Sequence, residues 1–168
     1  MERHSRIVIE SSPVKESKSN GAAEKALQLA ENMSRTVLEA LKDRVGLVSN
    51  KNMIPRAIRH GSWLYSRYAV GEDGRTGYER LKDKPYRGEL AILGEKVWYM
   101  KPGALKMPKL SARFEEGVFL GRLDRSNEVL IGTPNGLKRA RTFKRLPTGE
   151  QFDVDLLGKI KGVPRAEK

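Results

Sequence analysis

Residues 128–145, EVLIGTPNGLKRARTFKR, give the clearest indication of the fold. The first six residues are rich in β-branched and apolar side chains, which favour a strand. Pro134-Asn135-Gly136 is a strong signal for a tight turn, and residues 137–145 then return to an extended pattern. The stretch therefore predicts an antiparallel hairpin. Its second strand should have one strongly basic, solvated face because three cationic side chains are crowded there: Lys138, Arg139 and Arg141.

Two segments upstream of this hairpin have the same character. Residues 89–100, ELAILGEKVWYM, and residues 117–122, GVFLGR, both read as short strands. Four or five short antiparallel strands within about sixty residues predict a small SH3-like barrel or a related open barrel over residues 89–150. Residues 151–168 have little pattern, and we expect them to form a flexible tail.

The N-terminal half has helical periodicity after a first short strand, RIVIE, at residues 6–10. Asn20 can cap a long helix that runs to about Arg44, with Gly46 just past its end. One arc of this helix is predicted to be buried, and its members are Leu27, Ala30, Ser34, Val37, Leu38, Leu41 and Val45.

A second helix is predicted from about Asn52 to Tyr68, with Pro55 tolerated in its first turn. A glycine-bearing loop follows at residues 70–76, and then a short helical turn at residues 78–81. The apolar members of the second helix keep a looser version of the same spacing, and they are Ile54, Ile58, Trp63, Leu64 and Tyr68.

The charge of the chain favours a polyanionic partner. The formal net charge is +12, yet residues 1–50 hold 8 basic and 7 acidic side chains, so nearly all of the excess lies in residues 51–168. A basic surface of this kind suits the backbone of DNA or RNA. The simpler alternative is a basic protein without such a partner.

Several classes of function are excluded or disfavoured by composition. The chain has no cysteine, which excludes disulfides, thiolate catalysis and cysteine-based zinc sites. His4 and His60 stand alone and are expected to be surface or packing residues rather than metal ligands. No apolar run has membrane-spanning length and residues 1–30 lack the apolar core of a signal peptide, so we expect an intracellular protein of the nucleus or cytoplasm, without a membrane partner or a small-molecule substrate.

Four segments, in order, resemble the integrases of copia-type retrotransposons. Residues 20–24, NGAAE, are similar to the NGxxE motif at the head of the last catalytic-core helix. Trp63-Leu64 with residues 74–81, GRTGYERL, resembles the W and TPYE stretch after the core. Residues 93–97, LGEKV, and 117–121, GVFLG, resemble strands of the SH3-like domain that follows. The departures from the family pattern are Gly61, Ser66, Gly77 and Leu93.

The resemblance covers residues 6–150 and implies an α+β organisation from a Pol polyprotein. It would divide the chain into a truncated end of an RNase H-like integrase core (a strand plus the long helix) at 1–48, a helical connector at 49–88, the SH3-like barrel at 89–150 and the tail at 151–168. The implied ancestral role is DNA integration. The implied partners are DNA, a homo-oligomer or other parts of the polyprotein.

The resemblance also implies a catalytic role for Glu24. Integrases of this family use two aspartates and one glutamate to hold two Mg²⁺ ions for phosphoryl transfer, and Glu24 corresponds to the glutamate. From the residues alone, Glu24 is better explained as an acid favoured by a helix N-terminus, and only the resemblance assigns it the role of a metal ligand. Only 23 residues precede it, and they contain no aspartate. The first aspartate, Asp43, would lie about 28 Å away along the same helix, so we expect neither bound Mg²⁺ nor strand transfer or 3′-processing from this chain alone.

The basic side chains of the predicted barrel are the candidate nucleic-acid site. One group surrounds the first strand and the loop after it, and comprises Lys96, Lys101, Lys106, Lys109 and Arg113. A second group loads the last strand, and comprises Lys138, Arg139, Arg141, Lys144 and Arg145. Trp98, Tyr99 and Phe143 lie among them; we expect most of these aromatics in the core, because either Trp98 or Tyr99 must point inward.

Four classes of function follow from these observations. The first is a remnant of a transposon polyprotein that binds nucleic acid without chemistry, and the second is a working integrase separated from its upstream part. The third is a free-standing basic SH3-like module that binds RNA, which would need a self-sufficient fold. The fourth is a protein-interaction adaptor, which would need an aromatic groove for proline-rich peptides.

Overall fold

The computed structural model describes residues 21–46 and 53–162, which form two long helices followed by an antiparallel sheet in an α+β arrangement. The strand predicted at residues 6–10 and the predicted cap at Asn20 lie outside this range. The elements are α1 (Gly21–Val45), α2 (Met53–Tyr68), α3 (Gly77–Lys82), β1 (Lys96–Met100), β2 (Phe114–Arg122), β3 (Val129–Thr133), β4 (Gly136–Ala140), β5 (Phe143–Arg145) and α4 (Val154–Lys159), with 3-10 turns η2 (Ala104–Lys106) and η3 (Thr148–Glu150). Within the described ranges, no helix has the length and apolar character that crossing a bilayer requires.

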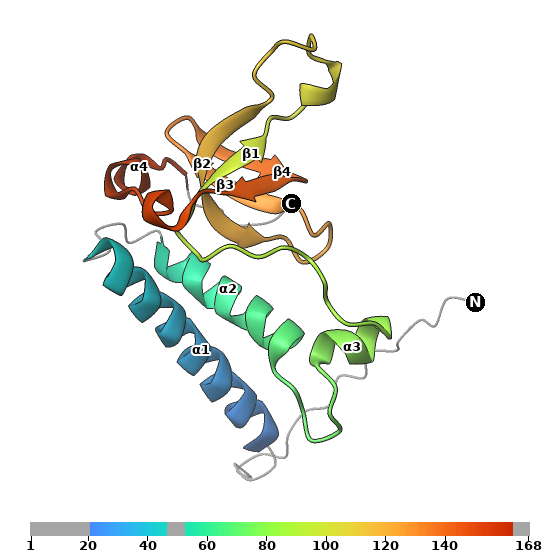
Figure 1. Ribbon diagram of the computed structural model, residues 1–168. Helices are drawn as coiled ribbons and strands as arrows, with labels where there is room; N and C mark the ends of the chain where they lie inside the picture. The colour runs from blue at the N-terminus through green and yellow to red at the C-terminus, as the bar shows by residue number, and fades with distance from the viewer. Residues whose placement is uncertain (1–20, 47–52, 163–168) are drawn as a thin grey trace.

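The long first helix has the predicted bounds. Gly46 follows it with φ of +75° and donates its N–H to the carbonyl of Lys42 at 2.8 Å, which closes the last turn. The predicted apolar arc is buried toward the C-terminal half, where Ser34 and Leu41 are enclosed, while Leu27 is exposed. Figure 1 shows α1 lying along α2.

A glycine sets how closely the two helices approach. A Cβ atom on Gly61 would lie 3.0 Å from the backbone nitrogen of Ser34 in α1. Any larger residue would push the helices apart, because that neighbour is backbone and cannot turn away. Gly61 thus has a packing role in this chain.

The buried face of α2 differs from the predicted one. Ile54, Ile58 and Tyr68 are exposed, whereas Met53 and Ala57 are buried together with Arg56, His60, Gly61 and Trp63. The reason is that α2 contacts α1 on one side and β2 on another, so its enclosed face includes small and polar side chains. Periodicity of apolar residues alone could not identify that face. His60 is a packing histidine, since its ring stacks on Trp63 with centroids 6.1 Å apart.

The sheet is antiparallel, with strand order β4-β3-β2-β1-β5. The predicted hairpin is confirmed: Thr133 pairs with Gly136 across the turn between β3 and β4. Of the strand predicted at 89–100, only residues 96–100 are extended in the sheet. The strand predicted at 137–145 is broken at residues 141–142 into β4 and β5.

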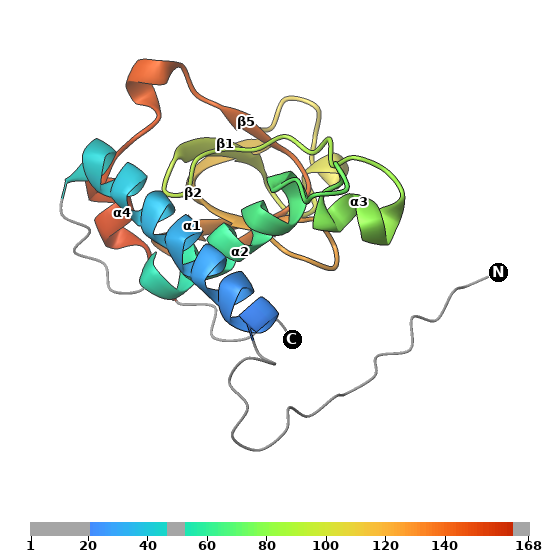
Figure 2. The same ribbon diagram turned by 90° about the horizontal axis from the view of Figure 1, so that it is seen from below.

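The break between β4 and β5 forces the sheet to coil. The two strands occupy opposite edges of the sheet, yet only Arg141 and Thr142 separate them in sequence. The edges of a flat five-stranded sheet would be about 19 Å apart. Three Cα steps reach at most about 11 Å, so the edges must curl toward one another. Figure 2 shows the strands wrapping round in this way.

The sheet nevertheless stays open within the described residues. β4 pairs with β3 and β5 pairs with β1, but β4 and β5 are not paired with each other, so hydrogen bonding does not close the barrel that the sequence predicted. A register shift in β2 between Phe119 and Arg122, with Gly121 at φ of +101°, sharpens the bend.

The core has two parts, one on each side of the sheet. Between the sheet and the helices lie Leu41 of α1, Met53 and Ala57 of α2, residues of β2 and β3, and Leu157 of α4. Inside the curl lie Val97, Tyr99, Phe119, Val129, Ile131, Ala140 and Phe143. The first part thus joins the helices to the sheet, and the second holds β1, β4 and β5 in place.

The prediction of a flexible tail is wrong for residues 151–162. Asp153 caps α4 by accepting a hydrogen bond from the backbone N–H of Leu156 at 2.8 Å. Leu157 and Ile160 are buried against the sheet and the helices. Helix α4 has only six residues, which is too short for apolar periodicity to predict it from the sequence. Packing stabilises this helix.

Candidate nucleic-acid interface

The loop between β1 and β2, residues 101–113, is held beside the end of β4. The N–H of Met100 donates to the carbonyl of Thr142 at 3.0 Å, and the N–H of Lys101 donates to the carbonyl of Arg113 at 2.9 Å. Gly103, at φ of +76°, then allows the tight turn that leads into η2. These bonds place the first residues of the loop against residues 139–141, which are distant in sequence.

A groove of about 350 Å³ lies between the two segments, and the cations that line it are Lys101, Lys106, Arg139 and Arg141. We call these four residues and the space between them the basic groove. Glu128 is the one carboxylate among the lining residues. It lies 3.8 Å from Arg141, whose side chain is 89% exposed, so this ion pair is weak.

The positive charge of the other three cations of the basic groove can interact with a ligand. Within the described part of the chain, Lys101, Lys106 and Arg139 form no ion pair with a carboxylate. Four positive groups around one acid give a concave surface of net positive charge, which suits the repeated phosphates of a nucleic-acid backbone. The structure thus unites members of both cationic groups predicted from the sequence.

Two of the predicted cations are engaged in ion pairs instead. Arg145 donates to both carboxylate oxygens of Glu95 at 2.7 and 2.9 Å, and Glu95 is fully buried. This bidentate contact raises the pKa of the Arg145 guanidinium. The ammonium of Lys96 lies 3.7 Å from Asp153, with its side chain only 16% exposed. Both cations therefore stabilise the fold, and the structure does not bring them to the basic groove.

Four more predicted cations lie on neighbouring surfaces. Lys109 and Arg113 belong to the loop that Figure 1 shows projecting from the sheet, but they are not among the residues that line the groove, and the Nε atom of Arg113 is buried. Lys138 is exposed, but it alternates with Arg139 along β4 and so points to the opposite side of the strand. The single basic face predicted for residues 138–141 is therefore divided between two sides. Lys144 lies on the exposed face of β5.

Trp98 is the exposed aromatic residue of this region. Tyr99 and Phe143 are buried in the core, as expected, whereas Trp98 is 40% exposed. It pairs with Lys144 of β5 on one side and with Glu116 of β2 on the other. An indole beside a lysine offers a stacking surface next to a phosphate-binding charge.

Tyr99 lies on the side of β1 that faces the interior of the curled sheet. Its hydroxyl donates to Glu115 at 2.8 Å while its ring packs inside the curl of the sheet. Burial, with the neighbouring Glu115, raises the pKa of Tyr99 to about 12. The phenol therefore stays neutral at ordinary pH.

Among the described residues, no carboxylates converge with Glu24 on a possible metal site. It is exposed in the first turn of α1, and no group of three His, Cys, Asp or Glu side chains that could hold a metal ion occurs within residues 21–46 and 53–162. Because α1 is continuous to Val45, Asp43 lies about 28 Å from Glu24 along the axis. The described residues therefore do not fit a two-metal site.

Residues 73–83, which include the GRTGYERL motif, form a self-supporting turn. Thr76 and Glu79 cap α3 reciprocally, with bonds of 3.1 and 2.7 Å. Arg80 pairs with Asp73 at 2.5 Å and Arg75 pairs with Asp83 at 2.9 Å. The hydrogen bond from Arg80 holds the pKa of Asp73 well below its usual range. The motif thus has a structural role.

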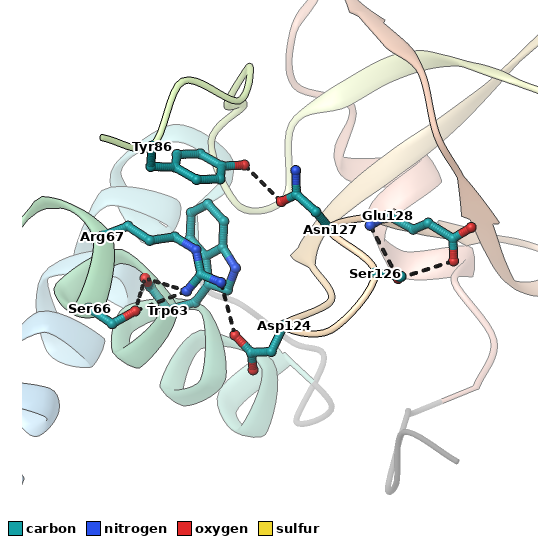
Figure 3. A network of polar contacts seen from close by, with 8 residues as sticks. All are labelled: Trp63, Ser66, Arg67, Tyr86, Asp124, Ser126, Asn127 and Glu128. Carbon is teal, nitrogen blue, oxygen red and sulfur yellow. Dashed lines mark hydrogen bonds and ion pairs between the residues drawn. The ribbon is translucent and has the colours of Figure 1, made fainter. Parts of the chain in front are cut away.

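An aromatic cluster around Arg67 fastens this turn to the rest of the molecule. The guanidinium carbon lies 4.1 Å from the ring centroid of Trp63, 5.4 Å from Tyr78 and 5.7 Å from Tyr86. Arg67 also reaches Asp124 at 3.4 Å. Figure 3 shows Trp63, Arg67, Tyr86 and Asp124 meeting between α2 and the turn after β2. Because Trp63 is buried here, it offers no open groove for a proline-rich peptide.

Comparisons of the chain with protein-family models, with curated protein sequences and with solved structures find no match. The strongest feature is the basic groove, where four cationic side chains from two distant segments surround a single carboxylate, that of Glu128.

Proposed function

We propose that this chain is a nucleic-acid-binding module that holds a sugar-phosphate backbone in the basic groove. The observation that carries the proposal is the convergence of Lys101 and Lys106 from one segment with Arg139 and Arg141 from another. Cations that only solubilise a surface have no reason to converge on a concavity. A concave surface lined by several cations can contact successive phosphates of one strand, which supports the proposal.

Single-stranded nucleic acid is the form that this surface favours. Trp98 and Met100 are two residues apart on β1 and so lie on the same side of the strand, and Met100 lines the groove. A base could stack on the indole while its backbone follows the groove. Bases in a duplex are already stacked and cannot do so.

Salt-dependent binding to matched oligonucleotides tests the proposal. Neutralising up to four phosphates on a single strand predicts a slope of log affinity against log salt of about −3. The double variant Lys106→Gln, Arg139→Gln should weaken binding about tenfold or more at low salt and reduce that slope by about one to two. Anisotropy of a labelled oligothymidine measures both.

A variant of equal charge change serves as the control. Lys82 and Arg87 are exposed and lie outside the groove, so Lys82→Gln, Arg87→Gln should leave the slope nearly unchanged. Equal effects of the two double variants would mean that net charge alone drives binding. That result would remove the groove from the proposal.

We propose further that the module descends from a copia-type integrase. A five-stranded antiparallel sheet whose first and last strands pair, as β1 and β5 do, is the strand arrangement of SH3-like domains. The GVFLG segment supplies most of β2 including its bend, and LGEKV forms the turn into β1. On this view α1 would be the last helix of the RNase H-like core, and the full-length parent would hold Mg²⁺.

This chain by itself should not join DNA strands. Glu24 lacks converging carboxylates within the described residues, and a pair of Mg²⁺ ions needs several oxygen ligands. An assay with Mg²⁺ and a pre-processed duplex should give no joined product above background. Joining activity that disappears in Glu24→Ala would contradict the proposal.

One observation favours the alternative of a free-standing basic RNA-binding or protein-interaction module. Leu41 of α1 is fully buried in the same core as the sheet and Leu157 of α4, so the long helix has a packing partner within this chain. Competition between RNA and DNA oligomers of one sequence distinguishes this alternative from descent from an integrase. Clear preference for RNA would favour the alternative.

A further inference from the structure

The loop between β1 and β2 carries two leucines that face solvent. Leu105 is 78% exposed and Leu110 is fully exposed. Figure 1 shows this loop, drawn in yellow, extending from the sheet on the side away from the helices. Each leucine would be stabilised by an apolar partner, because removal of apolar surface from water is favourable. We call Leu105 and Leu110 the loop leucines.

The loop has a defined backbone shape before any ligand binds. The 3-10 turn η2 begins at Ala104, whose side chain is buried and anchors this part of the loop. Further along, the N–H of Ser111 donates to the carbonyl of Pro108 at 3.0 Å. This bond closes a turn that has Lys109 and Leu110 at its corner. Because the loop is preorganised, little conformational entropy is lost when it contacts a partner.

The ionisable side chains of the loop are all cationic. The loop includes four cations and no acid. Two of these cations, Lys101 and Lys106, line the basic groove together with Leu105. A third cation, Lys109, is adjacent to Leu110 at the corner of the turn. A polyanion that is attracted to these charges therefore meets the loop leucines at the same time.

Two exposed leucines elsewhere in the molecule lie close to acids in sequence. Leu81 is 79% exposed on α3, between Glu79 and Asp83. Leu27 is exposed on α1, three residues after Glu24. Single exposed leucines of this kind are common on protein surfaces and do not indicate a ligand. The loop leucines differ from them because they occur as a pair on a projecting loop whose charges are all positive.

We propose that the loop leucines insert between neighbouring bases of the strand that the basic groove holds. This inference deepens the proposed function and rests on it. Apolar side chains that enter between two bases separate them and contact their flat faces, which removes apolar surface from water. Lys106 and Lys109, each next to a loop leucine in sequence, can contact the phosphates on either side. A single strand is the form whose bases separate most easily, because no base pair has to be broken.

Fluorescence of 2-aminopurine gives a direct readout of the insertion. Two adjacent 2-aminopurines in an oligothymidine are quenched by stacking, so their emission should rise when the protein separates them. Leu110→Ala should reduce this rise by about half and weaken binding about fivefold, because the apolar contact is lost. The double variant Leu105→Ala, Leu110→Ala should remove most of the rise. The slope of log affinity against log salt should not change in either variant, since no charge is altered.

Leu81→Ala is the matched control. It makes the same substitution at an exposed leucine that does not belong to the loop, so the emission rise and the affinity should stay at the parent values. Leu81 and Leu110 are both exposed, so both variants should fold, which circular dichroism checks. Equal effects of Leu81→Ala and Leu110→Ala would overturn the inference. A full emission rise in the variant that lacks both loop leucines would also overturn it.

Failure of this inference differs in its results from failure of the proposed function. If the leucines do not insert, the leucine variants keep the parent affinity and emission, while Lys106→Gln, Arg139→Gln still reduces the salt slope. If the groove does not hold the strand, Lys106→Gln, Arg139→Gln has no more effect than its control at Lys82 and Arg87.

An anionic lipid surface is the other polyanion that exposed leucines and lysines can bind. Sedimentation with phosphatidylserine vesicles tests it. We expect Leu110→Ala to leave any vesicle binding unchanged. Vesicle binding that Leu110→Ala abolishes, together with an unchanged oligonucleotide signal, would assign the loop to lipid and overturn the inference.

Discussion

The basic groove and the Arg67 cluster use the same cationic residue type in opposite ways. In the groove, Arg139 is exposed and has no ion pair within the described residues. In the cluster, Arg67 is enclosed by aromatic rings and reaches Asp124. The contrast teaches that the role of a cation depends on the acceptors around it. Enclosed cations stabilise the fold, and exposed converging cations are free to meet a ligand.

The largest expected effect is a loss of stability, and it should differ between the two tryptophans because one is enclosed and the other is exposed. Trp63→Ala should lower the free energy of unfolding by about 3–5 kcal/mol, because Trp63 is buried and holds Arg67 and Tyr86. Trp98→Ala should lower it much less, since Trp98 is 40% exposed. Urea unfolding measures both. Similar losses in the two variants would contradict the assignment of Trp63 to the scaffold.

Next in size is the pair formed by Arg145 and Glu95. Arg145→Ala leaves a buried carboxylate without its guanidinium, and breaking a buried pair is destabilising by about 3–5 kcal/mol. Arg145 is 39% exposed, so solvent screening should reduce the loss to about 2–3 kcal/mol. Arg139→Ala is the comparison, and its unfolding free energy should stay within about 0.5 kcal/mol of the parent. A larger loss for Arg139 would break the contrast.

Acid should weaken the fold through His60. Burial, and to a lesser degree the charge of Arg56, lowers the pKa of His60 from 6.5 to about 4. Between these two values the unfolded chain binds more protons than the folded one, so stability is full above pH 6.5 and falls as the pH drops toward 4. The limiting loss is roughly 3 kcal/mol.

A variant isolates that contribution. His60→Gln removes the titration, so its unfolding free energy should vary less than that of the parent between pH 6.5 and 4. The lowered pKa values of Asp73 and Glu79 also make the folded chain less stable in acid. Both residues are present in the parent and in the variant, so their contributions cancel in the difference. Parallel pH profiles would show that His60 is not buried in its neutral form.

The smallest expected effect concerns the ligand rather than the fold. Trp98→Ala should reduce affinity for single-stranded DNA by about fivefold to tenfold, because one stacking contact is lost. Affinity for a duplex of the same sequence should change little, since its bases are already stacked. Trp98→Phe should retain much of the single-strand affinity. If Trp98→Ala lost equal affinity for single-stranded and double-stranded DNA, the role of Trp98 would be purely structural.

Local patterns predicted the elements whose signals are strong and short in range. The long helix ends at Val45 with Gly46 beyond it, and the Pro134-Asn135-Gly136 turn joins two paired strands. Both follow from backbone preferences that neighbouring residues fix. The buried face of α2 and the helix α4 were missed because tertiary contacts, rather than apolar periodicity, decide them.

The candidate site was predicted in part. The sequence identified the cationic groups, and four of their members meet in the basic groove. It could not separate Arg145 from Arg139, because the buried Glu95 that engages Arg145 lies fifty residues away in the chain.

The sequence by itself determined the total charge, the α+β order of the elements and the single acid at the head of the long helix. These depend on composition and on contacts within a few residues. Only the tertiary structure decided which cations are neutralised, which aromatic residue reaches solvent and where the concave surfaces lie. The physical reason is that charge pairing and burial depend on distance in space, and the coiling of the sheet brings residues 101–106 beside residues 139–141.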